Sequence, residues 1–164
     1  MNAVCSLFAS NLSNIKGTIT FHQCHPSKPT KVSINLSGFR PNQIHAIHIH
    51  KFGDLRDGCT SLGAHFNPLN KNHGNIKLNG NERHAGDLIN NIQSDENGNV
   101  NYTYMDPLLS LYDNSIFNII GRSVVIHEKP DDLGLGGNKE SLITGNAGKR
   151  IACGIIGRAK NLAC

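Results

Sequence analysis

Residues 31–36, Lys-Val-Ser-Ile-Asn-Leu, alternate polar and apolar side chains without interruption. Successive side chains of a β-strand point to opposite faces, so this alternation places the three apolar residues on one buried face. The same period of two runs through residues 18–22 and 99–104. In the last of these the apolar set is Val100, Tyr102 and Tyr104. We therefore predict three strands, each with one face in the core and the other in water.

Strands also account for most of the remaining patterned sequence. Residues 45–50, 123–128 and 151–156 read as strands, the last two with more continuous burial, and Gly and Asn residues separate the runs. No stretch keeps a helical period over three turns, and residues 108–111 allow one short turn at most. The pattern predicts a single all-β domain over residues 1–164, a sandwich or barrel of roughly eight mostly antiparallel strands.

Two long segments, residues 51–83 and 129–149, do not follow this pattern. They are rich in Gly, Asn and His and lack apolar periodicity. Loops longer than about 15 residues are uncommon in compact domains unless they are functional or disordered. Because the residues with metal-ligand chemistry lie in or beside these segments, we predict two functional loops, with low-complexity disorder as the alternative.

Composition and charge exclude several classes of protein. No apolar run approaches the roughly 20 residues of a membrane helix, so we expect no membrane partner. The net charge is +4, but the lysines and arginines are scattered, which argues against a nucleic-acid partner. The first residues lack a basic segment followed by a long apolar one, and the 5 cysteines are sparse. Both features predict a cytoplasmic protein.

The spacing of the 9 histidines indicates metal binding. His48 and His50 are two residues apart in a predicted strand, so both side chains point to one face and can meet one ion. His45 has the opposite parity and is expected to be structural. A second set has the composition of a zinc site with three imidazoles and one carboxylate: His65, His73, His84 and Asp87. Spacing alone leaves open whether this second set converges or consists of exposed loop residues.

Two further histidine positions have more than one reading. His127 lies in an apolar strand, where an imidazole needs a partner, so a hydrogen-bonded core residue and a metal ligand fit equally well. His22 and His25 flank Cys24 in a loop that contains proline. We favour a solvated turn there over a surface metal site.

Several segments resemble copper/zinc superoxide dismutases. Residues 45–54, His-Ala-Ile-His-Ile-His-Lys-Phe-Gly-Asp, are similar to the first copper-binding stretch of that family. Residues 82–88, Glu-Arg-His-Ala-Gly-Asp-Leu, are similar to its zinc-binding end. Other segments match the family in the same order: 58–61, 65–68, 121–129, 131–134 and 145–154. The resemblance covers essentially the whole chain and implies an eight-stranded antiparallel Greek-key β-barrel with two long functional loops.

The resemblance also implies the roles of individual residues. The implied copper ligands are His48, His50, His65 and His127. The implied zinc ligands are His65, His73, His84 and Asp87, so that His65 bridges both metals. Asp131 would be the carboxylate that links His48 with His73, and Arg150 would lie over the copper. Cys59 and Cys153 would form a disulfide.

The activity that the resemblance implies is superoxide dismutation, in which copper is alternately reduced and reoxidised and O₂ and H₂O₂ are formed. His65 would carry a proton and Arg150 would attract the anion, so both are expected catalytic residues. The implied partners are superoxide, a second copy of the chain in a homodimer, and a copper chaperone. The alternative is a non-enzymatic metal-binding or chaperone-engaging decoy. A zinc hydrolase is disfavoured because four protein ligands leave zinc no position for water.

Four positions depart from the family pattern, one of them Pro130, which replaces a small residue just before Asp131. Lys139 stands where the family commonly has an acidic residue, and Ile143 where it commonly has lysine, so the charges near the substrate channel are redistributed. Arg158 replaces a usually apolar residue of the dimer contact, which makes a weakened dimer or a monomer the alternative. Residues that accompany this contact are kept: Gly53, Ile120 and Gly121. Cys24 and Cys164 have no family counterpart.

Overall fold

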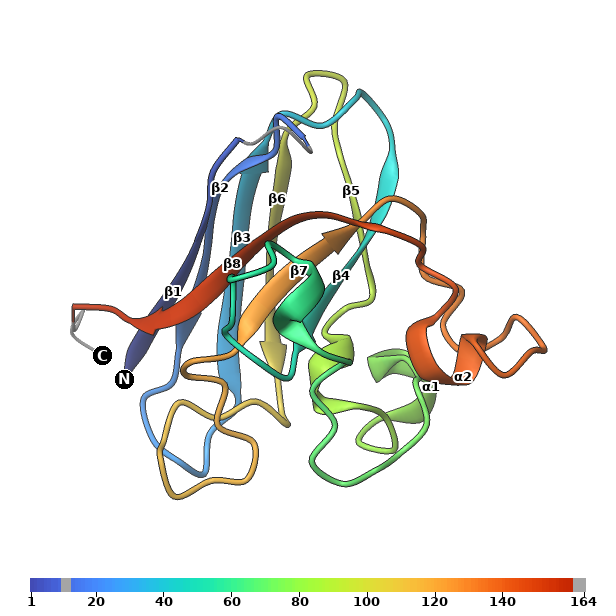
Figure 1. The fold of residues 1–164 in the computed structure, drawn as a ribbon. Coiled ribbons are helices and arrows are strands. Elements are labelled where there is room, and N and C mark those ends of the chain that lie inside the picture. The colour runs from blue at the N-terminus through green and yellow to red at the C-terminus, as the bar shows by residue number, and fades with distance from the viewer. Residues whose placement is uncertain (10–12, 161–164) are drawn as a thin grey trace.

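The computed structural model describes residues 1–9 and 13–160. Within these residues the chain forms eight strands: β1 (Asn2–Leu7), β2 (Lys16–His22), β3 (Thr30–Ser37), β4 (Ile44–His50), β5 (Asn91–Gln93), β6 (Val100–Asp106), β7 (Ser123–His127) and β8 (Arg150–Arg158). Neighbouring strands are antiparallel, in the order β5-β4-β7-β8-β1-β2-β3-β6. The two ends of this order approach each other, so the sheet curls into a nearly closed barrel (Figure 1). The all-β prediction is confirmed.

The connections between strands are of the Greek-key kind. β1, β2 and β3 form a meander, after which β3 pairs with β6, whereas β4 pairs with β5 and β7. The chain therefore crosses an end of the barrel between β3 and β4, and again between β6 and β7. These crossings bring β4, β7 and β8 together, although long loops separate them in the sequence.

The alternation predicted for residues 31–36 is confirmed in β3. Val32, Ile34 and Leu36 are at most 2% exposed and pack in the barrel core. The alternation in β6 holds only in part, because Tyr102 is 40% exposed although it pairs with Ile34. β6 is the last strand in the sheet order. It is therefore paired along its length with β3 only, and the core does not cover Tyr102.

Both long segments fold beside the barrel and bury side chains there, Leu62 and His73 from the first and Asp131 from the second, so the disorder alternative is wrong (Figure 1). Four short helical turns lie in or next to them: η1 (Thr60–Leu62), α1 (Ile76–Asn79), η2 (Ala85–Asp87) and α2 (Ser141–Thr144). In the part of the chain that the structure describes, no helix has the length and apolar character needed to cross a membrane.

The helical turn considered for residues 108–111 does not form. Groups outside the segment accept hydrogen bonds from its backbone N–H groups. Ser110 N donates to the Phe117 carbonyl at 3.1 Å, and Leu111 N donates to Gln23 Oε1 at 2.9 Å. These acceptors come from outside the segment, so its sequence alone does not reveal them.

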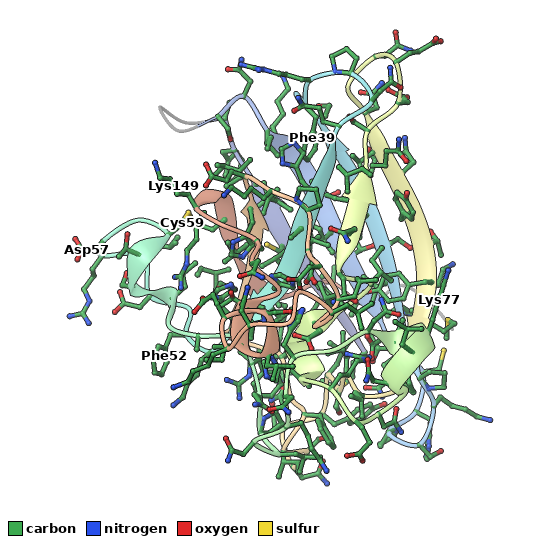
Figure 2. The ribbon with its side chains drawn as sticks, turned by 90° about the vertical axis from the view of Figure 1, so that its right-hand side faces the viewer. Phe39, Phe52, Asp57, Cys59, Lys77 and Lys149 are labelled. Carbon is green, nitrogen blue, oxygen red and sulfur yellow. A yellow bond between two sulfur atoms is a disulfide. The ribbon has the colours of Figure 1, made fainter. Side chains whose placement is uncertain are left out.

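A disulfide between Cys59 and Cys153 joins the loop 51–83 to β8, as the resemblance implied. Leu62 and Val125 pack beside Cys59 in a small apolar cluster outside the main core. Figure 2 shows Cys59 on one side of the barrel and Lys77, from the far part of the same stretch of chain, on the other. The loop therefore wraps past the barrel and is held to it by a covalent bond. Cys164 lies outside the described residues.

Candidate metal centre

β4 presents two histidines on its outer face. Ile47 and Ile49 belong to the barrel core, so His48 and His50, which alternate with them, lie on the opposite face. The long loops cover this face, and the two rings are only 0% and 2% exposed. The parity argument from the sequence is confirmed.

Four imidazoles form a group beside the paired strands β4 and β7, the four-histidine group: His48, His50, His65 and His127. Each ring contributes one nitrogen atom, and these four atoms all lie within 4.8 Å of one another. The opposite nitrogen of two rings is held by the backbone: His50 Nδ1 donates to the Gly63 carbonyl at 2.8 Å, and His127 Nδ1 to the Gly148 carbonyl at 3.1 Å. Contacts of this kind orient a ring so that its remaining nitrogen can face a metal.

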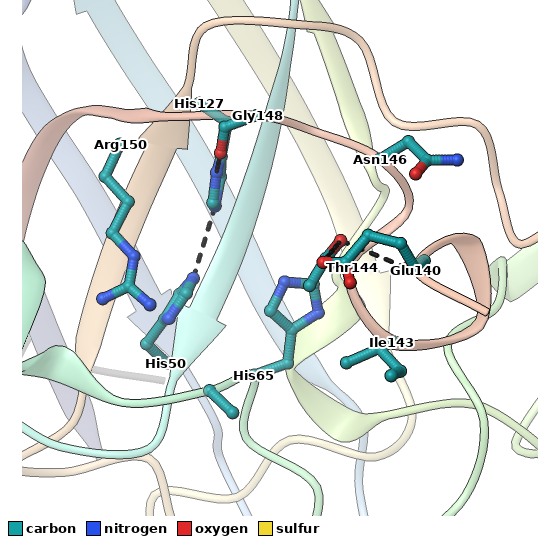
Figure 3. Close-up of a pocket in the computed structure, with 10 residues that line it drawn as sticks. His50, His65, His127, Glu140, Ile143, Thr144, Asn146, Gly148 and Arg150 are labelled. Carbon is teal, nitrogen blue, oxygen red and sulfur yellow. Dashed lines mark hydrogen bonds between the residues drawn. The ribbon is translucent and has the colours of Figure 1, made fainter. Parts of the chain in front are cut away.

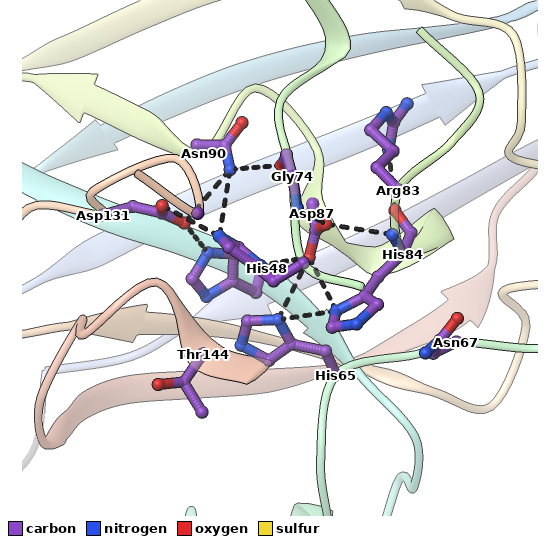
Figure 4. A network of polar contacts seen from close by, with 12 residues as sticks. His48, His65, Asn67, Gly74, Arg83, His84, Asp87, Asn90, Asp131 and Thr144 are labelled. Carbon is purple, nitrogen blue, oxygen red and sulfur yellow. Dashed lines mark hydrogen bonds and ion pairs between the residues drawn. The ribbon is translucent and has the colours of Figure 1, made fainter. Parts of the chain in front are cut away.

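A second group, the Asp87 group, forms where three rings converge on one carboxylate (Figure 4). Asp87 Oδ1 lies 2.8 Å from His73 Nδ1, 3.1 Å from His65 Nδ1 and 3.1 Å from His84 Nδ1. Asp87 Oδ2 accepts hydrogen bonds from the backbone N–H groups of Gly74 and His84. The sequence-predicted set therefore converges, and three imidazoles with one carboxylate match the donor set of a closed tetrahedral zinc site.

His65 belongs to both groups. Its Nδ1 faces Asp87, whereas its Nε2 is buried and has no hydrogen-bond partner among the described residues. The Nδ1 of His48, in the same four-histidine group, is also buried without a partner there. An unsatisfied buried polar atom costs about 1–3 kcal/mol. A metal ion that accepts both lone pairs removes this cost, so the residues present fit a metal at this position.

Asp131 connects the two groups. Its Oδ2 lies 2.6 Å from His48 Nε2, and its Oδ1 lies 2.9 Å from His73 Nε2. The carboxylate is buried, and the Asp131 backbone N–H donates to Asn91 Oδ1 at 2.8 Å. One side chain of the loop 129–149 thus orients one ring of each group.

Burial determines the charge states of the rings. Desolvation lowers the pKa of every ring in the four-histidine group, to about 3 for His65 and about 4 for His127. These rings are neutral at pH 7, which is the form that binds metal. Burial also acts to lower the pKa of His73, but hydrogen bonds to Asp131 and Asp87 outweigh it and raise that pKa to about 9.

A β-bulge brings Arg150 beside His127. Ile126 of β7 pairs with Ala152 of β8, but the next residue, His127, pairs with Arg150, so one residue of β8 is extra. Bulges re-aim side chains at sheet edges and next to functional sites. Here the bulge places a guanidinium at the mouth of the four-histidine group.

Arg150 lines a pocket of about 330 Å³ over the four-histidine group (Figure 3). Its Nη1 donates to the Cys59 carbonyl and its Nη2 to the Gly63 carbonyl, both at 2.6 Å. Among the described residues that line the pocket, Arg150 is the cation and Glu140 the anion. Ile143 also lines it, so the apolar residue noted at this position lies in the pocket wall itself.

Two glycines allow the loops to reach the site. At Gly86 a Cβ atom would overlap the Ile49 carbonyl oxygen, so glycine lets η2 pack directly on β4. Gly145 has φ +65° where α2 ends, and a Cβ atom there would overlap Asp131 Oδ1. Both positions therefore require glycine for close approach, and Gly145 requires it also for its left-handed backbone.

A family profile described as copper/zinc superoxide dismutase (SODC) matches residues 15–156. The chain belongs to this family. A superoxide dismutase (Cu-Zn) of Paramecium bursaria Chlorella virus 1 is 49% identical over 152 residues, which are 92% of this chain and 76% of that protein. A superoxide dismutase (Cu-Zn) of Neurospora crassa is 50% identical over 145 residues, 88% of this chain and 91% of that protein.

Solved structures agree with this assignment. A crystal structure described as the clock protein EA4 has a TM-score of 0.86 and 41% identity, and the alignment covers 96% of this chain and 94% of that one. The chain is thus a dismutase of the copper/zinc family, an oxidoreductase that converts superoxide to O₂ and H₂O₂ with copper and zinc as cofactors. The non-enzymatic alternative has no support.

The remaining histidines lie outside both groups. His45 Nδ1 donates to the His127 carbonyl at 2.8 Å, and its ring packs 5.4 Å from that of Phe39, so the structural role predicted for it is confirmed. His25 Nδ1 lies 2.8 Å from Ser27 Oγ in an exposed turn. Among the described residues, neither it nor His22 belongs to a group of three metal-ligating side chains.

A buried ion pair beside the Asp87 group was not predicted from the sequence. Arg83 is 1% exposed, and its Nη2 lies 3.1 Å from both carboxylate oxygens of Asp106. Its Nη1 donates to the His84 carbonyl at 2.9 Å, so it ties the Asp87 group to the end of β6. Arg83 stands next to His84 in the sequence, but nothing there indicates Asp106 as its partner.

Proposed function

We propose that the four-histidine group holds copper, that the Asp87 group holds zinc, and that His65 is shared between them. The observation that carries this assignment is the pair of buried nitrogens, His48 Nδ1 and His65 Nε2, that lack partners among the described residues. Imidazoles alone suit copper, whereas a closed set with one carboxylate suits zinc. Asp131 supports the pairing of the two sites because it orients a ring in each.

The chain's own residues would then hold a proton and bind the superoxide anion. Copper, when bound, supplies the one-electron oxidation and reduction of superoxide, and zinc supplies a fixed positive charge. One superoxide loses the electron that a second superoxide gains, and the second takes up two protons to leave as H₂O₂. His65 Nε2 would hold one of these protons beside the pocket whenever it is not a copper ligand, because contacts at Nδ1 keep the ring in place. The other proton comes from water.

The experiment that tests the metal assignment is metal analysis combined with a superoxide-consumption assay on reconstituted protein. We expect one copper and one zinc per chain and rapid superoxide consumption. Fully loaded protein that contains zinc alone would contradict the assignment of the four-histidine group.

Arg150 is proposed to attract and bind superoxide. Replacing it with glutamine should lower the second-order rate constant at least about tenfold and should also weaken its dependence on ionic strength, because a charge in a partly enclosed pocket focuses the field on the incoming anion. Stopped-flow measurements over a range of salt concentrations check both effects.

The matched control is Arg56→Gln, which removes the same charge from the exposed Arg56–Asp54 pair outside the pocket. We expect its rate constant to stay within about twofold of the unmodified protein, since exposed charges are strongly screened. Equal losses in both variants would show that only the net charge matters, and would remove the specific role of Arg150.

We propose that the chain is a homodimer. Gly53 packs so closely on the Gly121 carbonyl that a Cβ atom there would overlap it, and the neighbouring Phe52 is 48% exposed. Arg158 forms an ion pair with Asp113 of its own chain at 2.6 Å, which offsets its charge. Sedimentation equilibrium should give twice the chain mass of 17.8 kDa. A single-chain mass at micromolar concentration would refute the dimer.

We also propose a cytoplasmic location and copper loading by a chaperone protein. The sparse cysteines support the location. The copper loading proposal follows from the buried four-histidine group, which free copper must reach through the pocket. Cell fractionation tests the first proposal. Copper content of protein produced with and without a copper chaperone tests the second, and equal content would count against it.

A further inference from the structure

A network of buried amide side chains contacts Asp131. Asn75 and Asn90 are 8% and 0% exposed, and Asn75 Nδ2 donates to Asn90 Oδ1 at 2.7 Å. Asn90 Nδ2 in turn donates to Asp131 Oδ2 at 3.1 Å and to the Gly74 carbonyl at 2.9 Å (Figure 4). A series of hydrogen bonds therefore runs from Asn75 to the carboxylate that touches both histidine groups.

The orientation of the Asn75 amide is set by the start of α1. Asn75 is the N-cap residue, and its Oδ1 accepts the Lys77 backbone N–H at 2.8 Å. Because Oδ1 is engaged with a donor, Nδ2 must be the atom that faces Asn90. Asn79 closes the turn from the other side, since its Oδ1 accepts the Asn75 backbone N–H at 2.8 Å.

The orientation of the Asn90 amide follows from that of Asn75. Its Nδ2 donates to the Gly74 carbonyl and to Asp131 Oδ2 and also lies 3.4 Å from His73 Nε2, and its oxygen accepts the hydrogen bond from Asn75. The reversed amide would place its oxygen against a carbonyl and a carboxylate, with no hydrogen to share. Its backbone is pinned as well: φ is +62°, and its carbonyl accepts Ile47 N of β4 at 2.8 Å.

We propose that Asn75 is a positioning residue that acts through Asn90 to hold the Asp131 carboxylate in place for His48 and His73 together. Asp131 Oδ2 accepts from both Asn90 and His48, so its position is shared between the amide and the ring. Without the Asn75 donor, Asn90 loses the partner that selects its orientation, and Asp131 loses a fixed donor. The inference rests on the metal assignment proposed above, and it adds a residue that is in neither histidine group.

The decisive variant is Asn75→Asp in the protein loaded with copper and zinc. Aspartate keeps an oxygen for the Lys77 N–H, so the cap of α1 is retained, but it presents an acceptor to Asn90 Oδ1. Outer contacts of metal ligands contribute about 10–100-fold to metal affinity. We therefore expect zinc transfer to a chromophoric chelator to be about tenfold faster. With Co²⁺ in the Asp87 group, the visible absorption bands should shift, because the orientation of His73 changes.

Asn79→Ala is the matched control, because it disturbs the same turn of α1 without touching Asn90 or Asp131. We expect its zinc release within about twofold of the unmodified protein and an unchanged Co²⁺ spectrum. Unfolding of the metal-free variants measures any general loss of stability separately. Equal effects of Asn75→Asp and Asn79→Ala, or no effect of Asn75→Asp, would overturn the proposal.

Two further variants keep the result interpretable. If Asn75→Asp does not fold, Asn75→Ser replaces it: serine can cap α1 but is too short to reach Asn90, and unchanged zinc release would overturn the proposal. Asp131→Asn separates the proposal from the assignment on which it rests. If this variant releases zinc faster while the Asn75 variants do not, only the role of Asn75 fails. If it also releases zinc normally, the proposed link between the two metal sites fails.

Discussion

Replacing His127 with glutamine should lower superoxide consumption by more than about a hundredfold. His127 is 4% exposed at the end of β7, and its Nδ1 is committed to the Gly148 carbonyl, which leaves Nε2 for copper. Loss of contacts that merely orient a metal ligand already lowers metal affinity or activity about 10–100-fold, so loss of the ligand itself should lower activity further. The fold should persist, because glutamine is similar in length and occupies a strand end. Stopped-flow consumption of superoxide and copper content per chain measure the effect.

His45→Gln is the matched control for this prediction. Like His127, His45 is a buried histidine, but it lies in β4. It contacts the His127 backbone and belongs to neither histidine group. We expect it to keep one copper per chain and activity within a few-fold, with any loss appearing in stability. Full activity of His127→Gln with a normal copper content would refute the copper assignment.

Removal of the disulfide by Cys59→Ser should lower the free energy of unfolding of the metal-free protein by about 4–5 kcal/mol. Cys59 and Cys153 are 94 residues apart, and the chain-entropy model gives this value for a loop of that length. Because a single domain of this size has only about 5–15 kcal/mol in total, the loss is a large fraction of its stability. Urea unfolding of the variant and of the unmodified protein measures the difference.

The same substitution should also reduce activity in the metal-loaded protein. The Cys59 carbonyl accepts a hydrogen bond from Arg150 Nη1, so the disulfide holds in place one of the groups that position the guanidinium. Reduction of the unmodified protein with a thiol provides the control, since it breaks the same bond without a substitution. The reduced protein and the variant should agree in stability to within about 1 kcal/mol. A difference of less than 1 kcal/mol between oxidised protein and variant would refute the prediction.

Local periodicity predicted the strands well wherever one face is buried. β3 shows this most clearly, because its alternation matches its burial residue by residue. The same argument placed His48 and His50 on one face and His45 on the other, since parity along a strand is a property of the backbone alone. It failed at Tyr102, because the exposure of a residue near a sheet edge depends on which strand lies beside it.

Spacing could not decide whether the loop histidines converge. The Asp87 group assembles from three separate segments, and Gly86 and Gly145 allow the chain to pack closely there. The resemblance to the family implies this set independently of any geometry. Neither route indicated Asn90 or the pairing of Arg83 with Asp106, because the partners of buried polar groups are chosen by packing across the whole fold.

The sequence by itself determined the all-β class, the two long loops, and the strand face that carries the first two imidazoles, since period two and ligand chemistry are local. Only the tertiary structure decided which nitrogen of each ring is left available, which carboxylate joins the two groups, and where Arg150 points. Those features depend on a β-bulge, on loops that cross the barrel end, and on a disulfide across 94 residues. Each brings together atoms that are distant in the chain, which no local pattern can encode.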